Sequence, residues 1–236
     1  MQFPGDQGLT DDFQAMSLRV AEIIASQLRA KPASCLGLPT GRTPLGCYQI
    51  LSGWSESGQL DWSKVKCFAL DEYLDSDDSR SFGTYLQDNL YRHTNLPPES
   101  RFNPRFVDDY DALIAASGGL DLAVVGIGRN GHIAFNEPGT PRQSWTHSAW
   151  LTDSTRAANA AWFGSIETVP RIAVTMGIAT LLSSAEIVLI ASGEHKRGIL
   201  TRASSGPASA GLPASFLWEH SSLRVFTDFQ FAGKPG

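Results

Sequence analysis

The sequence predicts an α/β fold of Rossmann-like type, in which a doubly wound, mostly parallel sheet carries helices on both faces. Short apolar runs alternate along the chain with segments whose apolar residues recur at helical spacing, which is the pattern of this fold class. Residues 123–125 and 187–190 are continuously apolar, as expected for strands that helices cover on both faces. No linker or internal repeat divides the 236 residues, so we expect residues 1–236 to form one domain.

The elements follow in chain order. Apolar residues at helical spacing predict a helix over residues 10–31, with Thr10 or Asp11 as its cap. Further helices are expected at residues 44–54, 84–93, 178–182 and 194–203. Strands are expected at residues 33–38, 65–70, 122–127, 171–175, 186–191 and 223–227. Ligands of such sheets lie beyond the carboxyl ends of the strands, so the loops that follow strands are the candidates for chemistry.

Charge and cysteine usage exclude several classes of protein. Nineteen Lys and Arg residues stand against 24 Asp and Glu, and a net charge of −5 argues against a nucleic-acid partner. No apolar run approaches the roughly 18 residues of a membrane span, and residues 1–12 lack a cationic leader. Cys35, Cys47 and Cys67 lie among apolar neighbours without a CxxC pair, as reduced core thiols do. We therefore expect a cytoplasmic protein without a membrane partner.

The loop after the strand at residues 33–38 has the composition of an anion site. It contains Thr40, Gly41, Arg42 and Thr43. Thr43 suits a helix N-cap and Pro44 suits the first helical position. Free amides at a helix N-terminus, together with a cation, would hold an anion such as phosphate. An ordinary capped turn between a strand and a helix is the alternative.

Two carboxylates, Asp71 and Glu72, directly follow the strand expected at residues 65–70. Adjacent residues of a strand point to opposite faces, so at most one of the two enters a cleft. The alternation of side chains along the strand does not decide which of the two enters. The alternative is that both are surface acids at the start of a loop.

The third candidate loop, residues 126–132, matches the G-x-G-x-x-G dinucleotide fingerprint. We reject a dinucleotide site, and with it a dehydrogenase, because Pro138 and Gly139 leave little room for the helix that the fingerprint needs. His132 and Glu137 have the form of an acid–base pair, since a carboxylate at one ring nitrogen fixes which proton an imidazole carries. A zinc site lacks its usual ligand spacing here, and a buried structural histidine stays open.

Together these segments resemble the glucosamine-6-phosphate deaminase family. The segments that carry the resemblance are residues 36–44, 70–73, 126–139, 169–182 and 193–196, which span nearly the whole chain in order. The related 6-phosphogluconolactonases share the fold and the first loop but differ after the histidine. The resemblance implies conversion of glucosamine 6-phosphate to fructose 6-phosphate and ammonia, without a metal or an organic cofactor. A sugar phosphate is the expected partner, and we expect a monomer or a small homo-oligomer.

The resemblance also implies roles for single residues. Asp71 matches the base that moves a proton between C1 and C2 of the opened sugar. His132 matches the residue that helps to open the ring, and Glu137 matches its orienting carboxylate. Asn130 takes a position that is often Asp in the family, which excludes an Asp-His-Glu relay but not activity. The phosphate-binding positions correspond to Thr40, Gly41, Arg42, Thr43 and Lys196.

The chain departs from the family pattern at two further positions. Ala161 stands where the family usually places an Arg that meets the substrate phosphate, and Arg42 takes a position that is often small. We expect Arg42, jointly with Lys196, to replace the lost contact. Trp145 aligns with an Arg that allosteric members use with C-terminal residues to bind N-acetylglucosamine 6-phosphate, and the sequence ends at Gly236. We therefore expect hyperbolic kinetics without that activator.

Two other functions stay open at this point. One is a related sugar-phosphate hydrolase such as a lactonase, against which the run Phe135-Asn136-Glu137-Pro138 speaks. The other is a sugar-phosphate-binding protein that has lost catalysis, which Asn130 and the missing Arg suggest. Assays of lactone hydrolysis and of ammonia release distinguish the three.

Overall fold

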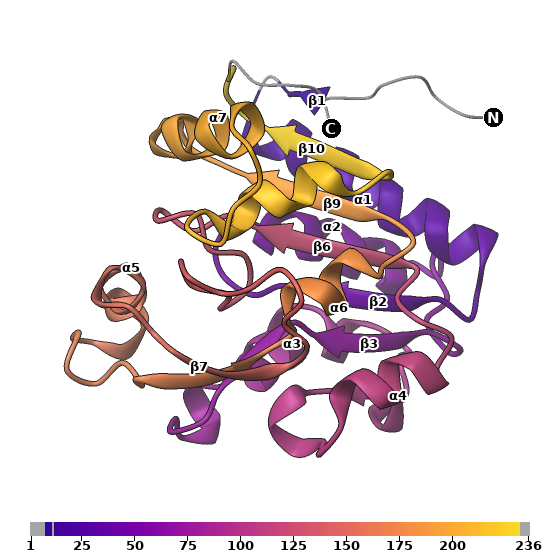
Figure 1. Cartoon of the computed structure of the whole chain (residues 1–236). Helices are drawn as coiled ribbons and strands as arrows, with labels where there is room; N and C mark the ends of the chain where they lie inside the picture. Colours follow the sequence, from indigo (N-terminus) through magenta and orange to yellow (C-terminus); the bar gives the residue numbers. More distant parts are fainter. Residues whose placement is uncertain (1–7, 11, 232–236) are drawn as a thin grey trace.

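A computed structural model describes residues 8–10 and 12–231 (Figure 1). Seven strands form one sheet in the order β1-β10-β9-β6-β2-β3-β5, and every pair of neighbours is parallel. The strands are β1 (Gly8–Leu9), β2 (Cys35–Leu38), β3 (Lys66–Ala69), β5 (Arg101–Phe102), β6 (Leu122–Gly126), β9 (Ile187–Ala191) and β10 (Leu223–Thr227). The predicted doubly wound, parallel architecture is therefore confirmed.

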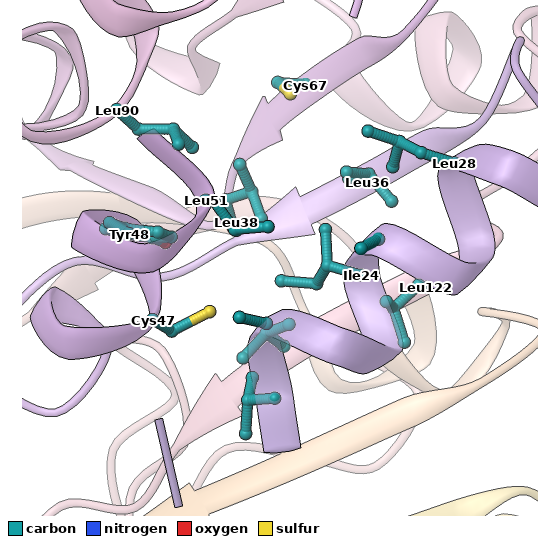
Figure 2. Packing of buried hydrophobic residues seen from close by; sticks show 14 of the residues in the cluster. Ile24, Leu28, Leu36, Leu38, Cys47, Tyr48, Leu51, Cys67, Leu90 and Leu122 are labelled. Atoms are coloured by element: carbon teal, nitrogen blue, oxygen red, sulfur yellow. The ribbon is translucent and has the colours of Figure 1, made fainter. Parts of the chain in front are cut away.

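Helices cover both faces of this sheet because successive strand residues point to opposite sides. The first face packs on α1 (Phe13–Ala30), α2 (Leu45–Glu56) and α3 (Phe82–Asn89). Figure 2 shows part of this core, with Leu36 and Leu38 of β2 facing Ile24 of α1 and Leu51 of α2. The second face packs on α4 (Tyr110–Ala116), α6 (Ile178–Leu182) and α7 (Arg197–Ser205).

A second, three-stranded sheet lies apart from the main one, and the sequence did not predict it. It consists of β4 (Asp71–Tyr73), β8 (Ile172–Thr175) and β7 (His147–Trp150), which pair antiparallel in the order β4-β8-β7. The strand expected at residues 171–175 exists, but its place in the parallel sheet was wrong. Burial alternates along β8, as in antiparallel sheets that have only one packed face. That face packs on an aromatic cluster around Tyr73, with α5 (Asp153–Phe163) beside it.

Several element ends differ from the predicted ones. The cap of α1 is Asp12, whose carboxylate accepts the Ala15 amide at 2.8 Å. Thr10 was wrong as the cap because its hydroxyl binds the Thr227 carbonyl instead, and Asp11 lies outside the described residues. The segments at residues 84–93 and 194–203 are each part α-helix and part 3-10 turn. The 3-10 turns of the chain include Asp78–Arg80, Tyr91–His93, Pro98–Ser100, Pro104–Phe106, Glu194–Lys196 and Pro213–Glu219.

The three cysteines are buried and free, as predicted. Burial raises the pKa of Cys35, Cys47 and Cys67, which keeps these thiols protonated and argues against a nucleophile. Within the described part of the chain, no helix combines the length and the apolar composition that crossing a membrane requires.

Candidate active site

A cleft of about 850 Å³ opens at the carboxyl ends of the parallel strands. The loops after β2, β6 and β9 form its floor, since these three strands are neighbours in the sheet, and α5 forms one wall. Of the predicted site residues, the cleft is lined by Thr40, Gly41, Arg42, Thr43, Asp71, His132 and Lys196. Asn130 and Glu137 lie behind His132 and contact it from outside the cleft. The fold thus brings together residues that are up to 156 positions apart, from Thr40 to Lys196.

The loop after β2 presents unpaired backbone amides to this cleft. Thr43 is not the helix cap: α2 begins after Pro44, which already has helical dihedrals and receives no side-chain cap bond. In the described residues, the amides of residues 40–43 donate no hydrogen bond. Gly41 has φ +101°, a conformation that residues with a Cβ rarely adopt. Free amides and the Arg42 guanidinium are groups that could bind an anion at this loop.

Three cations line the cleft, and one of them was not predicted. Arg42, Lys196 and Arg129 form no ion pair with any of the described residues. The Lys196 ammonium donates to the Ile127 carbonyl at 2.5 Å. Burial and the nearby Arg129 lower the pKa of Lys196 to about 8. An anion in the cleft would relieve this repulsion. Gly128, directly before Arg129, and Gly131, two residues after it, were the signal that could have revealed Arg129 as a residue of the cleft.

Asp71 enters the cleft and Glu72 does not. The Glu72 side chain is fully buried and accepts the amides of Phe82 and Gly83, both at 2.8 Å, at the N-terminus of α3. Oε2 of Glu72 also accepts a hydrogen bond from the side-chain Nδ2 of Asn103 at 2.7 Å. The Asp71 carboxylate receives no hydrogen bond from the described residues, and burial together with the charge of Glu72 raises its pKa well above the ordinary value. A carboxylate with a raised pKa is a stronger base than an ordinary one when it is ionised.

The His132 imidazole packs against the loop that precedes it. A Cβ at Gly128 would lie 2.3 Å from Cε1 of the ring, so only glycine permits this approach. The ring nitrogen Nδ1 lies 3.1 Å from Oγ1 of Thr155 and 3.7 Å from Oε2 of Glu137. The first is a hydrogen-bond distance and the second is an ion-pair distance. Thr155 is therefore the direct hydrogen-bond partner of the imidazole, and sequence reasoning missed it.

Glu137 is the centre of a polar network behind the histidine. Its carboxylate accepts Nδ2 of Asn130 at 2.7 Å and the Thr152 amide at 3.2 Å. Oδ1 of Asn130 accepts the His132 amide, which directs the Asn130 nitrogen toward Glu137. Burial alone would raise the pKa of Glu137, but His132, Thr155 and Asn130 outweigh it and lower the pKa to about 2. The carboxylate is therefore ionised at neutral pH, and it lies 3.7 Å from Nδ1 of the imidazole.

Thr152 and Thr155 were not predicted because α5 itself was not. Thr152 caps this helix by accepting the Thr155 amide, and an N-cap threonine three residues before its donor is a readable signal. The glycine-rich segment before His132 is followed by tight turns and no helix, which confirms the rejection of the dinucleotide fingerprint. No group of three or more His, Cys, Asp or Glu among the described residues could hold a metal ion.

Comparison with known proteins is consistent with this geometry. The pattern of the family described as "Glucosamine-6-phosphate isomerases/6-phosphogluconolactonase" matches residues 10–226. A glucosamine-6-phosphate deaminase of Rhodopirellula baltica is 44% identical over 93% of this chain and 92% of its own. The Bacillus pumilus enzyme of the same name is 41% identical over 92% of this chain and 95% of its own.

Solved structures extend the comparison to the fold. A monomeric glucosamine-6-phosphate deaminase superposes with a TM-score of 0.89 at 38% identity, covering 92% of this chain and 95% of the other. A 6-phosphogluconolactonase from Trypanosoma cruzi reaches a TM-score of 0.76 at 15% identity, over 96% of this chain and 95% of the other, and shows a common fold. The chain therefore belongs to the family of glucosamine-6-phosphate isomerases and 6-phosphogluconolactonases.

Proposed function

We propose that this protein is an isomerising deaminase that converts glucosamine 6-phosphate and water to fructose 6-phosphate and ammonia. One observation carries the proposal: a buried, unpaired carboxylate, an imidazole and an anion-binding loop line the same cleft. The deaminases that are about 40% identical over nine-tenths of the chain support the same reaction. No metal or organic cofactor is needed for the steps below, and residues 1–236 act as one domain.

His132 opens the sugar ring. Ring opening moves a proton from the hydroxyl at C1 to the ring oxygen, and an imidazole can accept the one proton and donate the other. The Glu137 carboxylate and the Thr155 hydroxyl lie at Nδ1 and orient the ring. Asn130 takes part only by hydrogen bonding, because an amide has no proton to relay at neutral pH.

Asp71 then moves the proton between the two carbons. Its carboxylate takes the proton from C2 of the open-chain aldehyde and returns it to C1 through an enediol-type intermediate. One proton of the amino group passes to O1, so that C1 becomes an alcohol and C2 an imine. Water adds to this imine, and ammonia leaves as the ketone forms. The raised pKa of Asp71 brings its basicity closer to that of the carbon acid, which favours proton transfer.

The phosphate is held at the other end of the substrate. The amides of residues 40–43 and the cations Arg42 and Lys196 bind it, and Arg129 adds a third positive charge. Arg42 lines the same cleft as Ala161, and this supports the idea that its guanidinium replaces the cation that α5 lacks. Binding the phosphate fixes C1 and C2 against Asp71, which converts binding free energy into orientation.

The assay that tests this proposal is direct. The protein is incubated with glucosamine 6-phosphate, and ammonia and fructose 6-phosphate are measured. Equal amounts of both products support the proposal. Hydrolysis of 6-phosphogluconolactone without ammonia release would identify a lactonase, and binding of the sugar phosphate without turnover would identify a protein that has lost catalysis.

The same proposal includes how the enzyme acts in the cell. We infer that it works as a monomer, by likeness to the monomeric deaminase at 38% identity. Three free, buried cysteines suit the reducing cytoplasm, and no nucleic-acid or membrane partner is part of the reaction. We also infer hyperbolic kinetics, because Trp145 replaces the Arg that allosteric members use.

A further inference from the structure

Two tyrosine hydroxyls bind carbonyl oxygens of the anion-binding loop. Oη of Tyr48, on α2, donates to the Pro39 carbonyl at 2.5 Å. Oη of Tyr85, on α3, donates to the Gly41 carbonyl at 2.5 Å. The two rings also contact each other, with centroids 6.5 Å apart and an edge-on geometry. Two helices thus fix two alternate peptide groups of one short loop.

These bonds determine where the loop amides point. A trans peptide group is planar, so its C=O and its N–H point in opposite directions, and the described residues contain no cis peptide bond. When a tyrosine holds the Gly41 carbonyl, the amide of Arg42 points away from that tyrosine. The Pro39 carbonyl sets the amide of Thr40 in the same way. Neither amide donates to any of the described residues, and both remain available to an anion.

The tyrosine hydrogen bonds also have an electrostatic effect. A carbonyl oxygen that turned toward the cleft would repel a phosphate dianion, and the hydroxyl donor holds the Gly41 oxygen in place. Gly41 has φ +101°, which a residue with a Cβ rarely adopts. The Tyr85 hydroxyl holds the carbonyl of this residue in one orientation.

Helix α5 packs against Tyr85 through an aromatic contact. The Trp162 ring contacts the Tyr85 ring at 5.9 Å between centroids and stacks on Phe82 at 5.5 Å. Trp162 follows Ala161, the position at which this chain lacks a cation. In this protein α5 thus contributes to the phosphate site through an aromatic contact that supports the loop.

We propose that Tyr85, assisted by Tyr48, is a positioning residue that orients the amides of Arg42 and Thr40 and so determines the affinity of the cleft for the phosphate of the substrate. The proposal rests on the proposed function, because the phosphate is taken to be that of the amino sugar. Tyr85 lines the cleft and acts through its bond to the loop, so its effect is expected in substrate binding and not in the chemical step.

The test is Tyr85→Phe, which removes the hydroxyl and keeps the ring that packs on Trp162. Loss of one neutral hydrogen bond to the loop should raise KM for glucosamine 6-phosphate roughly two- to tenfold, with kcat changed less than about twofold. Calorimetry with inorganic phosphate should show the same loss of affinity without any turnover. Tyr91→Phe is the matched control, because the Tyr91 hydroxyl is also buried but has no hydrogen-bond partner among the described residues.

Each outcome decides the proposal. An unchanged KM and an unchanged phosphate affinity in Tyr85→Phe would overturn it, as would an equal loss in Tyr91→Phe. A fall in kcat with KM unchanged would also overturn it, by placing Tyr85 in the chemical step. Thermal melting shows whether the variant is folded. If the wild type releases no ammonia but Tyr85→Phe still loses phosphate affinity, the proposed function fails and the role of Tyr85 stands.

Discussion

Replacing Arg42 by alanine tests how this chain binds phosphate although α5 carries Ala161. The Arg42 guanidinium lines the cleft, has no ion-pair partner among the described residues, and follows Gly41 in a loop of free amides. One charge-assisted hydrogen bond is worth roughly 1.5–3 kcal/mol, which corresponds to about a ten- to hundredfold change in binding. Arg42 is exposed in the free protein, so solvent screening places the expected loss toward the lower end of that range.

The measurement is KM for glucosamine 6-phosphate, together with the dissociation constant of inorganic phosphate. Arg42→Ala should weaken both by about tenfold, while kcat at saturation changes little. Arg29→Ala, an exposed arginine on α1 outside the cleft, is the control and should bind as the wild type does. The double variant Arg42→Ala, Ala161→Arg should recover most of the lost affinity, because it returns a cation to α5.

Two results would refute this reasoning. An unchanged KM in Arg42→Ala would show that Arg129 and Lys196 hold the phosphate without it. Failure of Ala161→Arg to rescue the variant would show that the two positions do not serve the same phosphate group. Arg129→Ala, measured beside Arg42→Ala, separates the contributions of the two arginines.

Four further predictions concern the chemistry and its control. Asp71→Asn should keep the fold and substrate binding but lower kcat roughly 10²–10⁴-fold, and equal activity in both proteins would assign the base elsewhere. His132→Ala should lose less activity with an open-chain substrate than with the ring form; an equal loss with both would exclude ring opening as its main role. With Trp145 in place of an arginine, rate curves should be hyperbolic and N-acetylglucosamine 6-phosphate should not activate, whereas a sigmoidal curve that this compound straightens would contradict the expectation. Because the pKa of Lys196 is about 8 in the free cleft and a bound phosphate raises it, KM should be lowest below pH 8 and rise above it, and Lys196→Arg should abolish the rise.

Much of the fold follows from local patterns that the sequence contains by itself. The helix at Ile178–Leu182 and the strand at Leu223–Thr227 have the predicted ends, because their apolar spacing and their flanking residues are local signals. The continuously apolar runs likewise predicted a parallel sheet covered on both sides. The candidate site could be placed at the carboxyl ends of the strands on the same grounds, since that edge is common to all parallel strands.

Other features depend on contacts between residues far apart in sequence. The choice between Asp71 and Glu72 is made by the amides at the N-terminus of α3 and by Asn103, which bind Glu72 and leave Asp71 to the cleft. The partner of His132 is Thr155, 23 residues away, and only packing places the first turn of α5 beside the imidazole. The strand at Ile172–Thr175 joined a different sheet from the expected one, because strand pairing depends on which other strands are near and not on the strand's own residues. Local periodicity therefore predicts which residues form helices and strands, whereas the partners of each polar side chain are known only once packing has brought distant segments together.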